Sequence, residues 1–66
     1  MLNHTFIVVL RLVTCKDSQG NWVKPKKRLT VEKKVDCPAK AFARIFALNE
    51  VENKMEQWEV VSVRKV

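Results

Sequence analysis

The chain begins with a run, residues 4–14 (HTFIVVLRLVT), in which apolar residues fill both alternating sets of positions. β-Branched and aromatic residues dominate this run and no helical period fits it better, so it predicts one long β-strand. Arg11 is its only charged residue. A strand that is apolar on both sides is typical of the middle of a sheet with both faces covered. The rest of the chain can cover only one face, which favours a partner on the other.

A polar run, residues 16–21, follows and contains the only glycine, Gly20, so it predicts a hairpin turn. Residues 22–35 predict a second strand that is apolar on one side only. Pro25 cannot donate a ladder hydrogen bond, and the lysines of this strand would protect a sheet edge from unwanted pairing. We therefore expect the second strand at the edge of the sheet and the first in its middle.

The sequence Asp36-Cys37-Pro38 predicts the start of a helix, because Asp36 or Cys37 can cap it and Pro38 suits a first turn. The helix is expected to end near Leu48 or Val51. Its helical period predicts an apolar stripe facing the sheet, formed by Ala39, Phe42, Ile45, Phe46 and Asn49. The residues expected to face away from the sheet are Lys40, Arg44 and Ala47.

Residues 57–65 (QWEVVSVRK) predict the last strand. Its apolar residues change parity after Val60, which indicates either a strand covered on both sides or a β-bulge. The whole chain, residues 1–66, then forms one small α+β domain with β-β-α-β topology. A right-handed crossover brings the last strand beside the first. The expected fold is a three-stranded antiparallel sheet of order 2-1-3 with the helix packed on one face.

The other face of this sheet is a candidate interface. Apolar residues of the first and last strands are expected on it: Ile7, Val9, Val13, Val61 and Val63. Face-to-face packing of two copies would bury them and enlarge a small core, which favours a homodimer. The alternative is a strongly twisted sheet whose side chains cover one another. A shift of register by one residue would exchange the two faces.

Composition places the chain among small globular proteins. It has 66 residues, of which 47% are apolar. The first apolar run carries Arg11 and lacks a basic leader and a cleavage site, so it does not resemble a signal peptide. No stretch approaches the roughly 20 apolar residues that span a bilayer. We therefore expect a protein of the cytoplasm of a bacterial or phage-infected cell, with no membrane partner.

The two cysteines are expected to be free thiols. Cys15 lies at the turn end of the predicted hairpin and Cys37 at its far end, about 30 Å away at ~3.4 Å per residue. A disulfide needs Cα atoms within about 7 Å of each other. Free thiols also fit a reducing cytoplasm.

The net charge of +6 favours acidic partners. The positively charged residues are most closely spaced just after the predicted turn. The candidate nucleic-acid-binding residues are Lys16, Trp22, Lys24, Lys26, Lys27 and Arg28. Such cations can follow the phosphates of DNA or RNA, and Trp22 could stack on an unpaired base. In the alternative interpretation the lysines only protect the sheet edge and Trp22 caps the core. The run KPKKR also fits a nuclear-localisation signal.

Residues suited to catalysis are scarce. The only histidine, His4, has no serine or cysteine that can be placed beside it with a third orienting group. His4 and Cys37 are too few for a structural zinc site. The acids near the predicted last turn are expected to be solvated. We therefore expect a non-enzymatic protein without a cofactor or metal.

Two segments carry a resemblance to a known group of proteins. They are the C-terminal WEVVSVRKV and the passage from strand to helix, TVEKKVDCPAKAFARIFA. In these the chain resembles small β-β-α-β proteins of unknown function from phages and mobile elements. The resemblance implies a fold and a phage-like origin, and no activity or site. It leaves two functions open: a nucleic-acid-binding homodimer, or an interaction module that modulates a host protein through its apolar sheet face.

Overall fold

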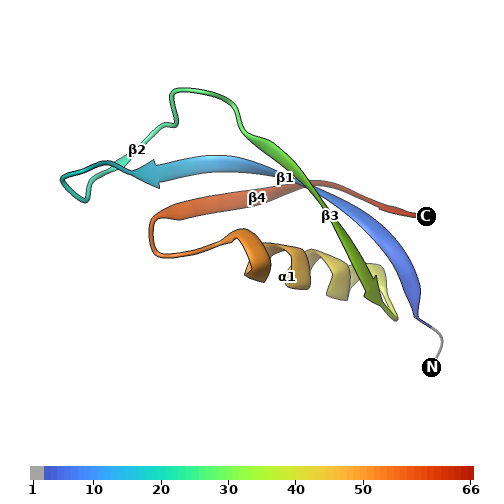
Figure 1. Cartoon of the computed structure of the whole chain (residues 1–66). Helices are drawn as coiled ribbons and strands as arrows, with labels where there is room; N and C mark the ends of the chain where they lie inside the picture. Colours follow the sequence, from blue (N-terminus) through green and yellow to red (C-terminus); the bar gives the residue numbers. More distant parts are fainter. Residues whose placement is uncertain (1–2) are drawn as a thin grey trace.

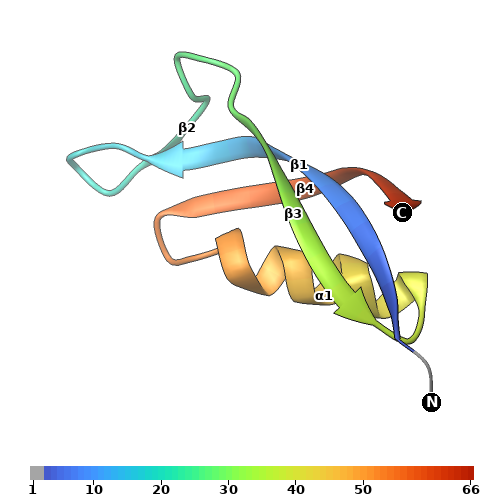
Figure 2. The ribbon, with the colours of Figure 1, turned by 45° about the vertical axis from the view of Figure 1, so that its right-hand side comes forward.

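The computed structural model describes residues 3–66 and contains one helix and one antiparallel sheet (Figures 1 and 2). In chain order the elements are β1 (His4–Lys16), β2 (Trp22–Val23), β3 (Thr30–Cys37), α1 (Lys40–Val51) and β4 (Glu56–Lys65). The helix packs on one face of the sheet. The predicted α+β fold is therefore confirmed.

β1 is the middle strand, as its two apolar faces predict. β4 pairs with it along one edge, from Phe6 to Cys15. The opposite edge is shared, because β3 pairs with residues 4–11 of β1 and β2 pairs with Cys15 and Lys16. The predicted order, in which the first strand lies between the hairpin strand and the C-terminal strand, is therefore confirmed.

The second predicted strand, residues 22–35, proves to be two strands, which corrects the prediction. Residues 24–29 leave the sheet between β2 and β3. Pro25 has no N–H to offer the ladder, and the cations that follow it repel one another, so neither favours a regular strand. One backbone hydrogen bond still ties the end of this segment to β1, from the Leu12 N–H to the Leu29 carbonyl (3.0 Å).

The core lies between α1 and one face of the sheet, here called the helix face. Alternate residues of β1 point into it, and Val8 and Leu10 are fully buried. Ala43 and Ala47 of α1 are fully buried in the same cluster. Small alanine side chains allow the helix backbone to approach the sheet closely. The other buried apolar residues are Phe6, Leu12, Val35 and Cys37.

α1 begins later than predicted, because the expected capping residues belong to the sheet. Asp36 and Cys37 are the last two residues of β3. Asp36 accepts a hydrogen bond from the Thr5 hydroxyl (2.7 Å), and the Cys37 thiol donates to the Ala39 carbonyl (3.1 Å). The N-cap is Ala39, which makes no side-chain hydrogen bond. The helix ends at Val51, within the predicted bounds.

The helix also turns a different side to the sheet than predicted. Ala47, which was expected to face solvent, is fully buried together with Ala43. Phe42, Ile45 and Phe46, which were expected to face the core, are exposed. The helical period favours the larger side chains as the buried stripe, whereas the observed packing selects the stripe of small ones.

Two register shifts, at Val13 of β1 and Val61 of β4, interrupt the pairing of these strands. Each is a β-bulge, in which one extra residue changes the parity of the strand. Beyond Val61, Val63 therefore pairs with Val8 and packs against the core. The prediction that Val63 lies on the face away from the helix is wrong, and the β-bulge explanation for the change of parity is confirmed.

The molecule is elongated, with extents of 46 × 19 × 13 Å. Figures 1 and 2 show α1 against one half of the sheet, while β2 and the segment after it extend past the helix. We call Lys16 together with residues 22–28 the basic arm. The sheet face away from α1 is called the open face.

Candidate nucleic-acid interface

The turn at the tip of the basic arm is built by Asp17. Its carboxylate accepts hydrogen bonds from the backbone N–H groups of Gln19 and Asn21, each 2.9 Å long. Gly20 has a φ of 82°, a conformation that residues with a side chain adopt at a cost. The chain therefore reverses tightly and returns β2 beside β1.

Trp22 is held next to a cation. Lys16 and Trp22 pair across β1 and β2, and the Lys16 ammonium lies 5.2 Å from the centre of the tryptophan ring. Such a cation–π contact favours one orientation of the ring. Trp22 is still 46% exposed. It therefore offers an aromatic surface beside positive charge, the combination with which proteins bind unpaired bases.

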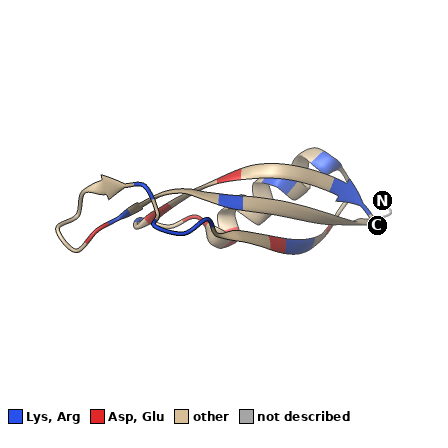
Figure 3. Cartoon of the chain, turned by 90° about the horizontal axis from the view of Figure 1, so that it is seen from above, with Lys and Arg blue, Asp and Glu red and all other residues tan. Residues whose placement is uncertain are grey.

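Four cations follow Trp22 in the segment that leaves the sheet: Lys24, Lys26, Lys27 and Arg28. All four are exposed, and within residues 3–66 none of them forms an ion pair. Figure 3 shows their positive segments gathered just after β2. Their charges are therefore available to an anionic ligand.

A groove of about 330 Å³ lies between this segment and β1. It opens where the edge of β1 lacks a strand partner, because pairing with β3 ends at Arg11 and pairing with β2 begins at Cys15. The lining residues are Arg11, Leu12, Val13, Lys24, Pro25 and Arg28. The Arg11 guanidinium donates to the Glu59 carboxylate, so Lys24 and Arg28 carry the charge available in the groove. Cations beside apolar walls suit a phosphate attached to an aromatic base.

The structure thus brings most of the predicted arm residues together. Lys16 contacts Trp22, while Lys24 and Arg28 share the groove. Lys26 and Lys27 are exposed on the same segment and do not line the groove. Sequence reasoning missed the part of β1 that forms the opposite wall. Pro25 within a predicted strand was the available signal, because it marks a place where the edge leaves its neighbour.

The open face is less apolar than predicted. Four of the five predicted interface residues remain candidates for it, with Ile7 and Val9 half-buried and Val13 and Val61 exposed. The fifth, Val63, packs on the helix side. The cross-strand neighbours of Ile7 and Val9 are polar: Glu32, Lys34, Ser62 and Arg64. The remaining apolar surface is therefore narrow.

α1 carries an exposed apolar surface that sequence reasoning assigned to the core. Phe42, Ile45 and Phe46 are 48%, 54% and 45% exposed. The two phenylalanine rings stack, with centroids 6.3 Å apart and planes 21° from parallel. We call these three residues the outer helix face. The spacing of Ala43 and Ala47 was the signal for it, because two alanines one turn apart can form the packed side of a helix.

The remaining chemical groups are dispersed. His4 and Cys37 pair across β1 and β3, at the end of the sheet where both were expected. Both cysteines are free, as the hairpin geometry predicts. Within residues 3–66, no three His, Cys, Asp or Glu side chains group so as to hold a metal ion. Over the same range, α1 is too short to cross a membrane and no other helix occurs.

Comparison with known proteins gives no family assignment. No protein-family model, curated protein or solved structure matches the chain. The resemblance to small phage and mobile-element proteins therefore stays a prediction, and function is inferred from the residues and their geometry.

Proposed function

We propose that this protein binds nucleic acid, DNA or RNA, through its basic arm by neutralising phosphates with little sequence readout. The observation that carries the proposal is the set of four exposed cations within residues 24–28, which form no ion pair within the described chain and border a groove. Cations that replace the counterions of a nucleic acid bind it largely independently of sequence.

Two acidic residues beside the arm are already engaged by other groups. The Asp17 carboxylate holds the turn, and the Glu59 carboxylate accepts a hydrogen bond from Arg11. The charge of Glu59 is balanced by Arg11, whereas Asp17, which is held by neutral N–H groups, keeps its negative charge at the turn. The arm also extends past α1, which leaves it accessible to a long polymer.

The test replaces the four arm cations, Lys24, Lys26, Lys27 and Arg28, with glutamine. A control variant removes the same charges elsewhere, by Lys34→Gln, Lys54→Gln, Arg64→Gln and Lys65→Gln, all at exposed positions. Fluorescence anisotropy with labelled oligonucleotides gives affinity as a function of salt. The arm variant should bind more weakly than the control, and its log–log salt slope should fall by about 0.9 for each lost contact to duplex DNA.

Two results would contradict the proposal. One is equal affinity of the arm and control variants, which would attribute binding to net charge alone. The other is no binding by the parent protein at about 50 mM salt, where screening is weak.

A second candidate function, also non-enzymatic, is modulation of a host protein through the open face. The exposed Val13 and Val61 favour it. A pull-down from host lysate with and without nuclease separates the two functions. A partner retained after nuclease treatment, and lost when Val61 is changed to glutamate, would support the second candidate.

A further inference from the structure

The β-bulge at Val13 determines the face on which β1 presents its last residues. Trp58 of β4 packs against the core, so its neighbour Gln57 points to the open face. Gln57 pairs with Thr14 of β1, and the Thr14 hydroxyl donates to the Gln57 side chain (2.9 Å). Thr14 therefore lies on the open face, although its parity is that of the buried Leu12.

The bulge thereby turns Trp22 toward the side of the groove. Lys16 follows Thr14 by two residues and shares its face, and Trp22 pairs with Lys16 and contacts its ammonium. Arg11, which borders the groove, also lies on the open face, because it precedes the buried Leu12. Without the extra residue, Lys16 and Trp22 would lie on the helix face. The ring and the Arg11 wall of the groove are therefore on one side of β1.

The groove has a size and lining that suit one nucleotide. Its volume of about 330 Å³ is at the low end of small-ligand pockets, which measure about 300–1,000 Å³. Lys24 and Arg28 form no ion pair within residues 3–66, and the other walls are largely apolar. Val13 in the groove and Lys16 beside Trp22 are three residues apart, about 10 Å at ~3.4 Å per residue. A strand with one base on Trp22 can therefore place a nearby phosphate in the groove.

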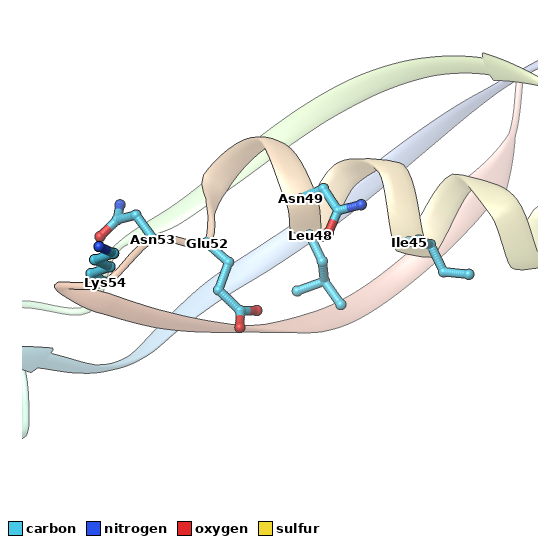
Figure 4. Close-up of a pocket in the computed structure, with 6 residues that line it drawn as sticks. All are labelled: Ile45, Leu48, Asn49, Glu52, Asn53 and Lys54. Atoms are coloured by element: carbon cyan, nitrogen blue, oxygen red, sulfur yellow. The ribbon is translucent and has the colours of Figure 1, made fainter.

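A second hollow, of about 510 Å³, lies at the C-terminal end of α1 (Figure 4). Its charged lining residues are Glu52 and Lys54, whose charges have opposite signs, and its other lining residues are uncharged. A phosphate would find no net positive charge there. An anionic ligand therefore favours the smaller groove of the arm, where both available charges are positive.

We propose, resting on the proposed function, that the arm binds unpaired DNA or RNA in preference to a duplex. One base stacks on Trp22, and a neighbouring phosphate lies in the groove between Lys24 and Arg28. Stacking on a side chain requires a base with a free face, which the interior of a duplex does not offer.

The tip of the arm opposes insertion into a duplex. The Asp17 carboxylate accepts hydrogen bonds from neutral N–H groups, so the turn keeps a negative charge. A hairpin that entered the major groove would bring this carboxylate between two rows of phosphates. β2 also forms only two residue pairs with β1, about 7 Å of ribbon, whereas the major groove is about 8.5 Å deep.

Fluorescence anisotropy at one salt concentration tests the preference with labelled probes of about 12 nucleotides, within the usual range of site sizes. The probes are oligothymidine, oligouridine, a G·C-rich duplex and a strand of abasic sites. Charge density alone favours the duplex. The parent should nevertheless bind the tighter of the two base-bearing strands at least roughly fivefold better than the duplex or the abasic strand, the gain from one base–aromatic stack.

Two matched pairs of variants assign this preference to the ring and the groove. Trp22→Ala should reduce binding of the base-bearing strand to that of the abasic strand, whereas Val23→Ala, at the exposed neighbour on the other side of β2, should preserve the difference. Arg28→Gln should weaken binding roughly tenfold, as loss of a charge-assisted hydrogen bond does. Lys27→Gln, at an exposed position outside the groove, should weaken it less. Circular dichroism checks that the variants are folded.

Equal or tighter binding of the duplex would overturn the proposal and leave phosphate binding by the arm intact. An abasic strand bound as tightly as the base-bearing strands would do the same, because phosphates alone would then account for the affinity. Equal effects of Arg28→Gln and Lys27→Gln would remove the groove from the site. A parent that binds none of the probes at about 50 mM salt would instead contradict the proposed function itself.

Discussion

The Lys16 ammonium lies 5.2 Å from the centre of the Trp22 ring, and nearly half of the tryptophan is still open to solvent. In the proposed complex with nucleic acid, a base stacked on this ring would lie close to the Lys16 ammonium. Trp22→Ala should therefore weaken the binding of single-stranded oligonucleotides by about 1–3 kcal/mol, the usual value of one base–aromatic stack. Fluorescence anisotropy measures the loss, and Trp22→Phe, which keeps an aromatic ring, should retain most of the affinity.

Duplex DNA of the same length provides the control for Trp22→Ala, because its bases are not free to stack on a side chain. An equal loss of affinity for the duplex would show that Trp22 supports the arm rather than a base.

Leu10→Ala should lower the free energy of unfolding by about 2–5 kcal/mol, because Leu10 is fully buried at the centre of the helix face. Val9→Ala should cost less, since Val9 is half-buried on the opposite side of β1. Urea unfolding followed by circular dichroism compares the two. A larger cost for Val9→Ala would show that the open face is the better packed one.

Ala47→Leu should destabilise the protein by about 1–3 kcal/mol, because Ala47 is fully buried in the core between α1 and the sheet and a larger side chain would overpack it. Ala41→Leu is the matched control at an exposed position of the same helix and should change stability by less than about 0.5 kcal/mol. Thermal unfolding of both variants checks the side that α1 turns to the sheet. Tolerance of leucine at position 47 would contradict the observed helix orientation.

The two thiols should differ in reactivity. Titration in denaturant without reductant should count two thiols per chain, since both cysteines are free. In the folded protein Cys15, which is half-buried, should react first, whereas Cys37 should react only when the fold opens. Cys15→Ser should therefore remove the fast phase. A single phase in the parent would mean that the two sites are equally accessible.

The sequence was sufficient to predict the strand order, because β1 is apolar on both sides and Pro25 marks an edge. It also placed Ile7 and Val9 on the face of β1 away from the helix, although a shift of register by one residue would have exchanged the two faces. These predictions held because they depend on a period of two, which a regular strand preserves.

The predictions that failed depend on features that pattern alone does not determine. α1 has two sides that could pack on the sheet. Hydropathy favours the side with Phe42 and Phe46, whereas in the structure the side with the small alanines is buried. Val63 changed sides because a bulge at Val61 adds one residue, and no turn residue marks that position. The groove beside the basic arm could not be predicted, because its position depends on where the edge strand leaves β1. These are properties of tertiary packing rather than of local preference.

The gap in the edge of β1, between its pairing with β3 and its pairing with β2, separates the basic arm from the core. We expect the arm to unfold locally more easily than the core. β2 is held to β1 by only two residue pairs, whereas β3 and β4 share the core with the helix. We therefore expect the arm to open while the core remains folded, so that its backbone amides exchange with solvent hydrogen much faster than those of the core. A ligand that occupies the groove would slow this exchange. The arm would then become ordered around its ligand. It could adapt to ligands of differing shape without lowering the stability of the core formed by β1, β3, β4 and α1.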